Sequence, residues 1–299
     1  SLRGKKDVSG FINAFSGSHH YILDYLAEEV LNRQSSDVKQ FLLETSILVR
    51  LCGSLCDMLT GRSDSQAMLV QLESANLFIS PLDDERRWYR YHQLFATILR
   101  NQLSRSEPER MALLHQRASI WYEKEGLTEE AIDHALLSGN AKRAADLLGK
   151  AAPHMLGQGQ AVGILDYLSR IPEPLIRDNP WLCVGFAWAA LFASKQEVLS
   201  SMLDWANEAL SESAEKLSPD SHANVHRIKG HILSIQSFIA QARGDITGAI
   251  RLAEEANREL PGDDPGDLLA RAVNSLGLVD SYRKTGDIAK AVPFFEELL

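Results

Sequence analysis

Two pairs of side chains have a spacing that could serve a metal ion. His222 and His226 are four residues apart, so on a helix their imidazoles share one face. No second cluster of ligands accompanies them and His231 falls off that face, so a solvated helix surface is favoured over a metal site. Cys52 and Cys56 also have helical spacing, and not that of a zinc knuckle, so they are expected to pack as small apolar residues. The sequence predicts no metal.

Nucleotide-binding and catalytic motifs are missing as well. The runs at Gly4-Lys5-Lys6 and Gly149-Lys150-Ala151 lack the earlier glycine and the following Ser or Thr of a phosphate-binding P-loop. The glycines of residues 157–163 follow a helical pattern and not a strand, which indicates a linker between helices. No Ser-His-Asp, Cys-His or paired-carboxylate arrangement stands out. We therefore expect no catalytic residue, no enzyme activity and no cofactor in this chain.

A predicted β-hairpin is the only convincing β-structure. Residues 77–82 and 87–91 alternate as two strands around a polar turn. Helical patterns at residues 37–48, 52–59 and 64–75 precede the hairpin, and helix resumes at about His92. Helices followed by a hairpin are the order of a winged-helix domain, which we predict over residues 36–105, after a lead-in and linker helix in residues 1–35.

This winged helix is not expected to bind DNA. Its third helix, residues 64–75, would enter the major groove, yet it contains two acidic residues and no Lys or Arg. Three arginines of the hairpin, Arg86, Arg87 and Arg90, suit an acidic protein surface equally well.

Everything after residue 106 indicates helix pairs. A glycine, a few polar residues and then an alanine recur at Gly126, Gly139, Gly244 and Gly286. The glycine would end one helix, a polar residue would cap the next, and the alanine would let the two pack closely. We predict a helical-pair linker region at residues 106–178 and truncated TPR-like sensor repeats at residues 179–299. The predicted fold class is mostly α, with a winged-helix domain bearing one β-hairpin and then a TPR-like α-solenoid of antiparallel helix pairs.

Three tryptophans are candidates for binding an effector on the helical repeats: Trp181, Trp188 and Trp205. Tryptophan at helical spacing is also typical of a helix core, and the sequence leaves both interpretations open.

Composition excludes several classes of protein. Of 299 residues, 45% are hydrophobic and 24% are charged, which is ordinary for a chain that buries a core. The formal net charge of −9 argues against nucleic acid as a partner of the whole chain. Three cysteines make no disulfide framework, and no apolar run approaches the roughly 20 residues that cross a bilayer. We expect a cytoplasmic protein without a membrane partner.

The missing initiator Met and the uncapped last helix suggest a piece of a longer chain.

Several ordered segments resemble the large ATP-binding LuxR-family transcriptional regulators of the MalT type, which are STAND-type proteins. The segments are residues 10–31 (GFINAFSGSHHYILDYLAEEVL), residues 41–48 (FLLETSIL), and residues 75–78 (ANLF) followed by 88–95 (WYRYHQLF). The helical pairs that follow resemble the sensor region of the same family more loosely.

The resemblance implies a partner in cis at each end of this segment. An upstream nucleotide-binding module would hold ATP or ADP, and a C-terminal helix-turn-helix would supply the only DNA contact. The winged helix would hold a resting, ADP-bound state, and His92, where the hairpin meets the next helix, is by analogy the candidate nucleotide sensor. A helix-capping or core histidine is the alternative for His92.

On this interpretation the helical repeats receive a small-molecule inducer or a regulatory protein and relay its binding to the nucleotide module. The alternative is a TPR-like scaffold that binds proteins without any nucleotide switch.

Overall fold

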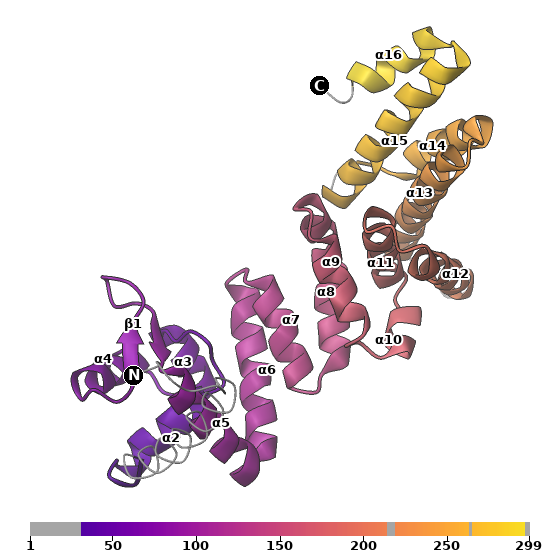
Figure 1. Ribbon diagram of the computed structural model, residues 1–299. Helices are drawn as coiled ribbons and strands as arrows, with labels where there is room; N and C mark the ends of the chain where they lie inside the picture. The colour runs from indigo at the N-terminus through magenta and orange to yellow at the C-terminus, as the bar shows by residue number, and fades with distance from the viewer. Residues whose placement is uncertain (1–30, 214–218, 263–264, 297–299) are drawn as a thin grey trace, which may run out of the picture. The chain divides into compact units, whose positions relative to one another are not determined.

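The structure, a computed structural model, describes residues 31–213, 219–262 and 265–296 (Figure 1). The chain forms two compact units, residues 1–140 and 141–299. The boundary falls within the region predicted as a helical-pair linker. The predicted helix of residues 1–35 lies almost entirely outside the described residues.

The described part of the first unit begins with the winged helix. Three short helices come first and a two-stranded antiparallel hairpin follows: α2 (Ser36–Thr45), α3 (Gly53–Thr60), α4 (Ser65–Ser74), β1 (Ile79–Pro81) and β2 (Tyr89–Tyr91). Ile79 pairs with Tyr91, and Pro81 pairs with Tyr89. This order confirms the winged-helix prediction, with strands shorter than the alternating pattern suggested.

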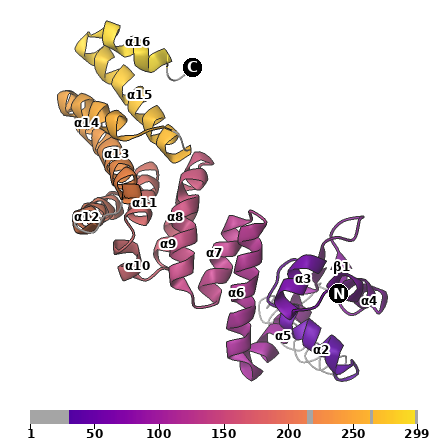
Figure 2. The same ribbon diagram turned by 180° about the vertical axis from the view of Figure 1, so that it is seen from behind.

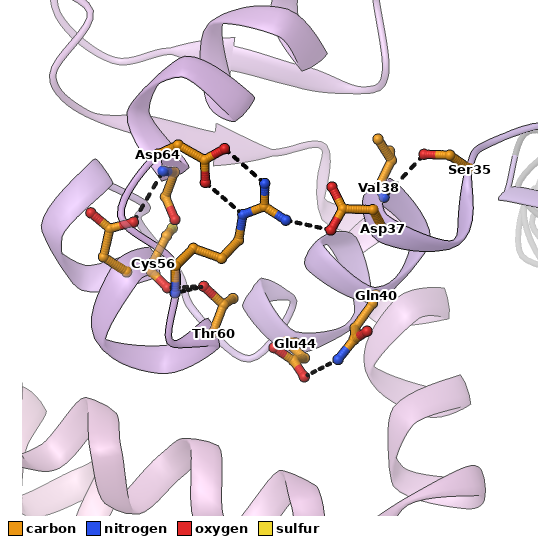
Figure 3. Close-up of polar contacts among 11 residues, drawn as sticks. Ser35, Asp37, Val38, Gln40, Glu44, Cys56, Thr60 and Asp64 are labelled. Carbon is orange, nitrogen blue, oxygen red and sulfur yellow. Dashed lines mark hydrogen bonds and ion pairs between the residues drawn. The ribbon is translucent and has the colours of Figure 1, made fainter.

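Local chemistry sets the ends of these helices. The Ser35 hydroxyl caps α2 by accepting from the amide of Val38 (Figure 3). Helix α3 ends at Gly61, whose φ is 76°. Arg62 donates to both carboxylate oxygens of Asp64 and also pairs with Asp37 (Figure 3). This fork holds the loop between α3 and α4 against the start of α2.

A β-bridge extends the hairpin beyond the two predicted strands. Leu51 and Tyr89 exchange two backbone hydrogen bonds of 2.8 Å. Both side chains are fully buried. A single bridging residue has no alternating pattern, which is why the sequence did not reveal it.

Three helices complete the first unit: α5 (Gln93–Ser106), α6 (Pro108–Lys124) and α7 (Thr128–Leu137). The hairpin packs on α6 through Trp88 and Trp121, whose rings meet edge to face at 6.3 Å. Arg50 stacks on Trp88 and pairs with Glu130 of α7. The α6–α7 pair therefore belongs to the same body as the winged helix.

The second unit consists of helices within the described residues: α8 (Ala141–Gly157), α9 (Ala161–Leu168), α10 (Glu173–Arg177), α11 (Pro180–Phe192), α12 (Gln196–Ser213), α13 (Pro219–Ala242), α14 (Ile246–Glu259), α15 (Pro265–Thr285) and α16 (Ile288–Glu296). Consecutive helices pair, α11 with α12, α13 with α14 and α15 with α16, as Figure 2 shows. The helix pairs of the predicted fold class are confirmed.

The repeated glycine–alanine pattern has the structural role that the sequence predicts. Gly244 and Gly286 each have a φ of 84° at the turn between two paired helices. The alanines five residues later, Ala249 and Ala291, are buried at 2% and 8% exposure, respectively. None of the described helices is long and apolar enough to span a bilayer.

Candidate functional site

A cavity of about 530 Å³ lies in the second unit, among α8, α11, α13 and α15. Its wall combines an indole, two cationic side chains and side-chain amides: Trp181, Lys150, Arg227, Asn179 and Asn224. A smaller apolar recess lies beside it and shares Trp181 and His231 with its wall. A concave site with a few converging polar groups is the usual form of a small-molecule site.

The start of α11 places two of these groups. Asn179 caps the helix by accepting the amide of Leu182 at 3.1 Å, and Pro180 takes the first helical position. This cap directs Trp181, in the first turn, to the cavity wall.

A chain of polar contacts runs behind the cavity wall. The Trp188 indole donates to Nδ1 of His231 at 3.1 Å, and Nε2 of His231 lies 3.2 Å from Oδ1 of Asp267. The Nε of Arg227 donates to the other oxygen of Asp267 at 2.9 Å. The Arg227 guanidinium also lies over the Trp181 ring, 5.2 Å from its centroid. We call Trp188, His231, Asp267 and Arg227 the relay, since each orients the next.

The relay fixes the protonation pattern of His231. An indole nitrogen can only donate, so Nδ1 of His231 must accept and carry no proton. Nε2 therefore carries the proton of the neutral ring and donates it to Asp267.

The Asp267 carboxylate is held charged in the interior. It has no exposed surface, and burial alone would raise the pKa of this carboxyl. The hydrogen bonds from His231 and Arg227 outweigh that effect and hold the pKa below its usual value. A charged carboxylate in turn fixes the direction of the guanidinium at the cavity.

The three predicted effector tryptophans do not form one site. Trp181 lines the cavity. Trp188 is only 2% exposed and lines the apolar recess but not the cavity. Trp205 lines neither and is covered by Arg177, at 4.5 Å from its ring centroid. The sequence missed His231, Asp267 and Arg227, which come from two helices other than that of Trp181. The only hint in the sequence was that His231 lies on a different face of its helix from His226.

His226 itself pairs with Glu259 through Nδ1, and the side chain of His222 lies outside the described residues. Among the residues whose positions are described, no group of three His, Cys, Asp or Glu side chains could hold a metal ion.

His92 lies at the N-cap position of α5 in the first unit. Its backbone amide donates to Phe78 at 2.7 Å, but its side chain makes no capping hydrogen bond. The imidazole is exposed, which rules out the core alternative. It lines a separate hollow of about 730 Å³ together with Arg90 and Arg100.

The hairpin arginines are largely engaged within the domain. Arg86 pairs with Glu73 of α4 at 3.2 Å, and Arg87 pairs with Glu85 at 2.8 Å. Since α4 itself has no Lys or Arg, its exposed side is poor in the donors that a recognition helix brings to DNA.

Comparison with known proteins extends these findings. Residues 27–111 match the family described as the MalT winged helix domain. The chain is 32% identical over 210 residues to a serine/threonine-protein kinase PknK of Mycobacterium tuberculosis, covering 70% of this chain and 19% of the kinase. It is 28% identical over 277 residues to an HTH-type transcriptional regulator MalT of Yersinia pestis, covering 93% of this chain and 30% of the regulator.

The chain thus spans less than a third of these relatives' own length. It is MalT-like over nearly all of its residues and carries a MalT-type winged-helix domain within residues 27–111.

Proposed function

We propose that this chain is the signal-receiving part of a transcriptional regulator, in which the cavity of the second unit binds a small effector. The observation that carries the proposal is the cavity wall, where Trp181 and a preoriented Arg227 lie side by side. A preformed polar group on a rigid helix favours ligand binding because little order is lost when the ligand arrives.

The two kinds of relative support a regulatory role over a catalytic one. The same segment resembles part of a protein named as a kinase and part of a protein named as an HTH-type transcriptional regulator. Proteins with different outputs share it, so its own role is the reception and relay of a signal.

In the same proposal, the winged helix communicates with an upstream nucleotide module through the hollow beside His92. The exposed imidazole and the neighbouring Arg90 and Arg100 are suited to the phosphates of ADP. Effector binding on the helical repeats would then release the ADP-bound resting state, ATP would drive assembly, and a C-terminal helix-turn-helix would contact DNA.

A thermal-shift screen separates this proposal from a protein-binding scaffold. A metabolite that raises the melting temperature of the chain, and fails to do so in Trp181→Ala, supports the sensor. Trp205→Ala is the matched control, since Trp205 lies away from the cavity. Stabilisation by peptides or proteins alone would favour the scaffold.

The nucleotide part is tested in the full-length regulator with two substitutions of His92. His92→Ala should raise activity without inducer and weaken ADP binding. His92→Asn should do the same while supplying a better helix cap, which separates lost contact with nucleotide from lost helix stability. Unchanged ADP affinity together with unchanged basal transcription in both variants would end this part of the proposal.

A further inference from the structure

The charges at the cavity of the second unit are unevenly compensated. Asp146 on the cavity wall pairs with Lys142 at 3.6 Å, and Asp267 behind the wall pairs with Arg227. Lys150, which lines the cavity from α8, has no ion-pair partner within the described part of the chain. The Lys150 ammonium therefore faces the cavity without forming an ion pair with any of the described residues.

The helix ends at the cavity add to this positive field. Asn179 and Trp181 belong to the start of α11, and Gly266 belongs to the first turn of α15. The N-terminus of a helix carries a partial positive charge, which favours an anion within its first turn. The start of α11 and Lys150 therefore act on the same space, whereas the first turn of α15 already carries the charged Asp267.

The relay gives Arg227 a fixed direction in this space. Asp267 holds its Nε, the Trp181 ring supports its guanidinium plane, and the neutral His231 holds Asp267 in turn. A guanidinium held in this way is a preorganised donor toward a planar acid group.

The apolar recess beside the cavity is narrow. A Cβ at Gly185 would lie only 2.9 Å from the Cβ of Ala152, so α11 and α8 are in close contact there. The space between Trp181 and this contact suits a short carbon skeleton.

We infer that the effector is a small organic anion, with its carboxylate or phosphate bound by Lys150 and Arg227 and its carbon skeleton against Trp181. This inference rests on the proposed function, because it names the chemical class of the ligand in the same cavity. The alternative within the proposed function is an uncharged polar molecule of the same size.

The test is a titration of the chain with succinate, citrate, glycerol 3-phosphate and inorganic phosphate, and with glycerol and glucose as uncharged probes. Binding is followed by the melting temperature and by tryptophan fluorescence at 50 and 200 mM salt. We expect at least one acid to bind, with affinity falling at the higher salt, and the uncharged probes to be silent.

Charge-removing variants locate the bound acid. Lys150→Gln should weaken it about tenfold or more, the effect of losing one charge-assisted contact. Lys195→Gln is the matched control, since Lys195 is exposed in the same unit and lines neither the cavity nor the recess. We substitute Lys150 and not Arg227, because Arg227→Gln would also remove the ion-pair partner of the buried Asp267.

The outcomes separate this inference from the proposed function. No response to any acid, or an acid response unchanged in Lys150→Gln, overturns the anion inference. An uncharged probe that binds alone, in a manner sensitive to Trp181→Ala, overturns the anion inference and leaves the effector cavity standing. Stabilisation by peptides or proteins alone removes both.

Discussion

The indole of Trp188 and the imidazole of His231 are joined by a buried hydrogen bond of 3.1 Å between α11 and α13. Because the indole only donates, this one contact sets which nitrogen of His231 is protonated. Through Asp267 the same contact determines how Arg227 is presented to the cavity. The arrangement at the cavity of the second unit thus depends on Trp188, a side chain that does not line it.

Trp188→Phe is expected to destabilise the chain by about 1–3 kcal/mol, because Nδ1 of His231 then stays buried without its donor. Trp205→Phe, with the same change of ring on a side chain covered by Arg177, should cost less. Urea unfolding measures both. The ¹⁵N resonances of His231 should report an unprotonated Nδ1 in the wild type, and a protonated Nδ1 there would contradict the relay.

His231→Gln and His231→Leu separate the relay from packing. A glutamine offers an acceptor to Trp188 and a donor to Asp267, whereas leucine offers neither. We expect slow exchange of the Arg227 Nε–H in the wild type and in the glutamine variant, and fast exchange in the leucine variant. Equal exchange in all three proteins would show that His231 does not position Arg227.

A second buried ion pair predicts a strong effect in the first unit. Glu44 of α2 is 4% exposed and accepts from Arg110 of α6 at 2.5 Å and from Gln40 at 3.0 Å. Arg110→Met should lower the free energy of unfolding by about 3–5 kcal/mol, because it leaves a buried charge without its partner.

Two further variants serve as comparisons for Arg110→Met. Glu44→Leu combined with Arg110→Met should recover much of the loss, since the unpaired charge is gone. Arg87→Met removes an ion pair in which both side chains are about 70% exposed, and should cost about 0–1 kcal/mol. A loss in Arg110→Met no larger than that in Arg87→Met would mean that Glu44 finds another partner.

The features predicted correctly from the sequence are those set by near neighbours in the chain. The three short helices before the hairpin and the hairpin between residues 79 and 91 each depend on a few consecutive residues. The glycine–alanine turns of the repeats are equally local. Periodicity and turn chemistry are sufficient for such features.

The site itself depends on contacts between residues distant in the sequence. His231 and Asp267 are 36 positions apart, on helices whose packing decides that they meet. Trp205 was grouped with Trp181 by residue type, yet α12 turns it toward Arg177 of α10. A sequence pattern shows which face of a helix is buried, but not which other helix packs against that face. The contacts of the relay therefore could not be predicted.

A buried histidine pair predicts how the first unit responds to acid. Nδ1 of His115 on α6 lies 2.9 Å from Nδ1 of His134 on α7, and both rings are less than 10% exposed. Burial lowers the pKa of each to about 4, against 6.5 for an ordinary histidine, and the positive charge of Arg100 acts in the same direction.

Between pH 6.5 and 4 these two histidines bind protons in the unfolded chain but stay neutral in the folded one. The free energy of unfolding should therefore fall as the pH is lowered through this range. The loss should be on the order of 3 kcal/mol for the first proton. Urea unfolding at pH 7, 6, 5 and 4 measures it. Replacing both histidines, His115→Phe with His134→Leu, should reduce the slope, while His92→Gln should keep it because His92 is exposed. An unchanged slope in the double variant would assign the acid response to other groups.

A turn glycine of the repeats and a glycine within a helix predict opposite signs for the same substitution to alanine. Gly244 has a φ of 84°, which disfavours any side chain, so Gly244→Ala should destabilise the second unit by about 1–2 kcal/mol. Gly163 is exposed within α9, and nothing lies within 4 Å of where its Cβ would be. Gly163→Ala should therefore stabilise by about 0.5–1 kcal/mol, since alanine loses less conformational entropy in a helix. Urea unfolding distinguishes the two variants, and a shift of the same sign in both would mean that backbone conformation does not decide the effect of alanine at these two glycines.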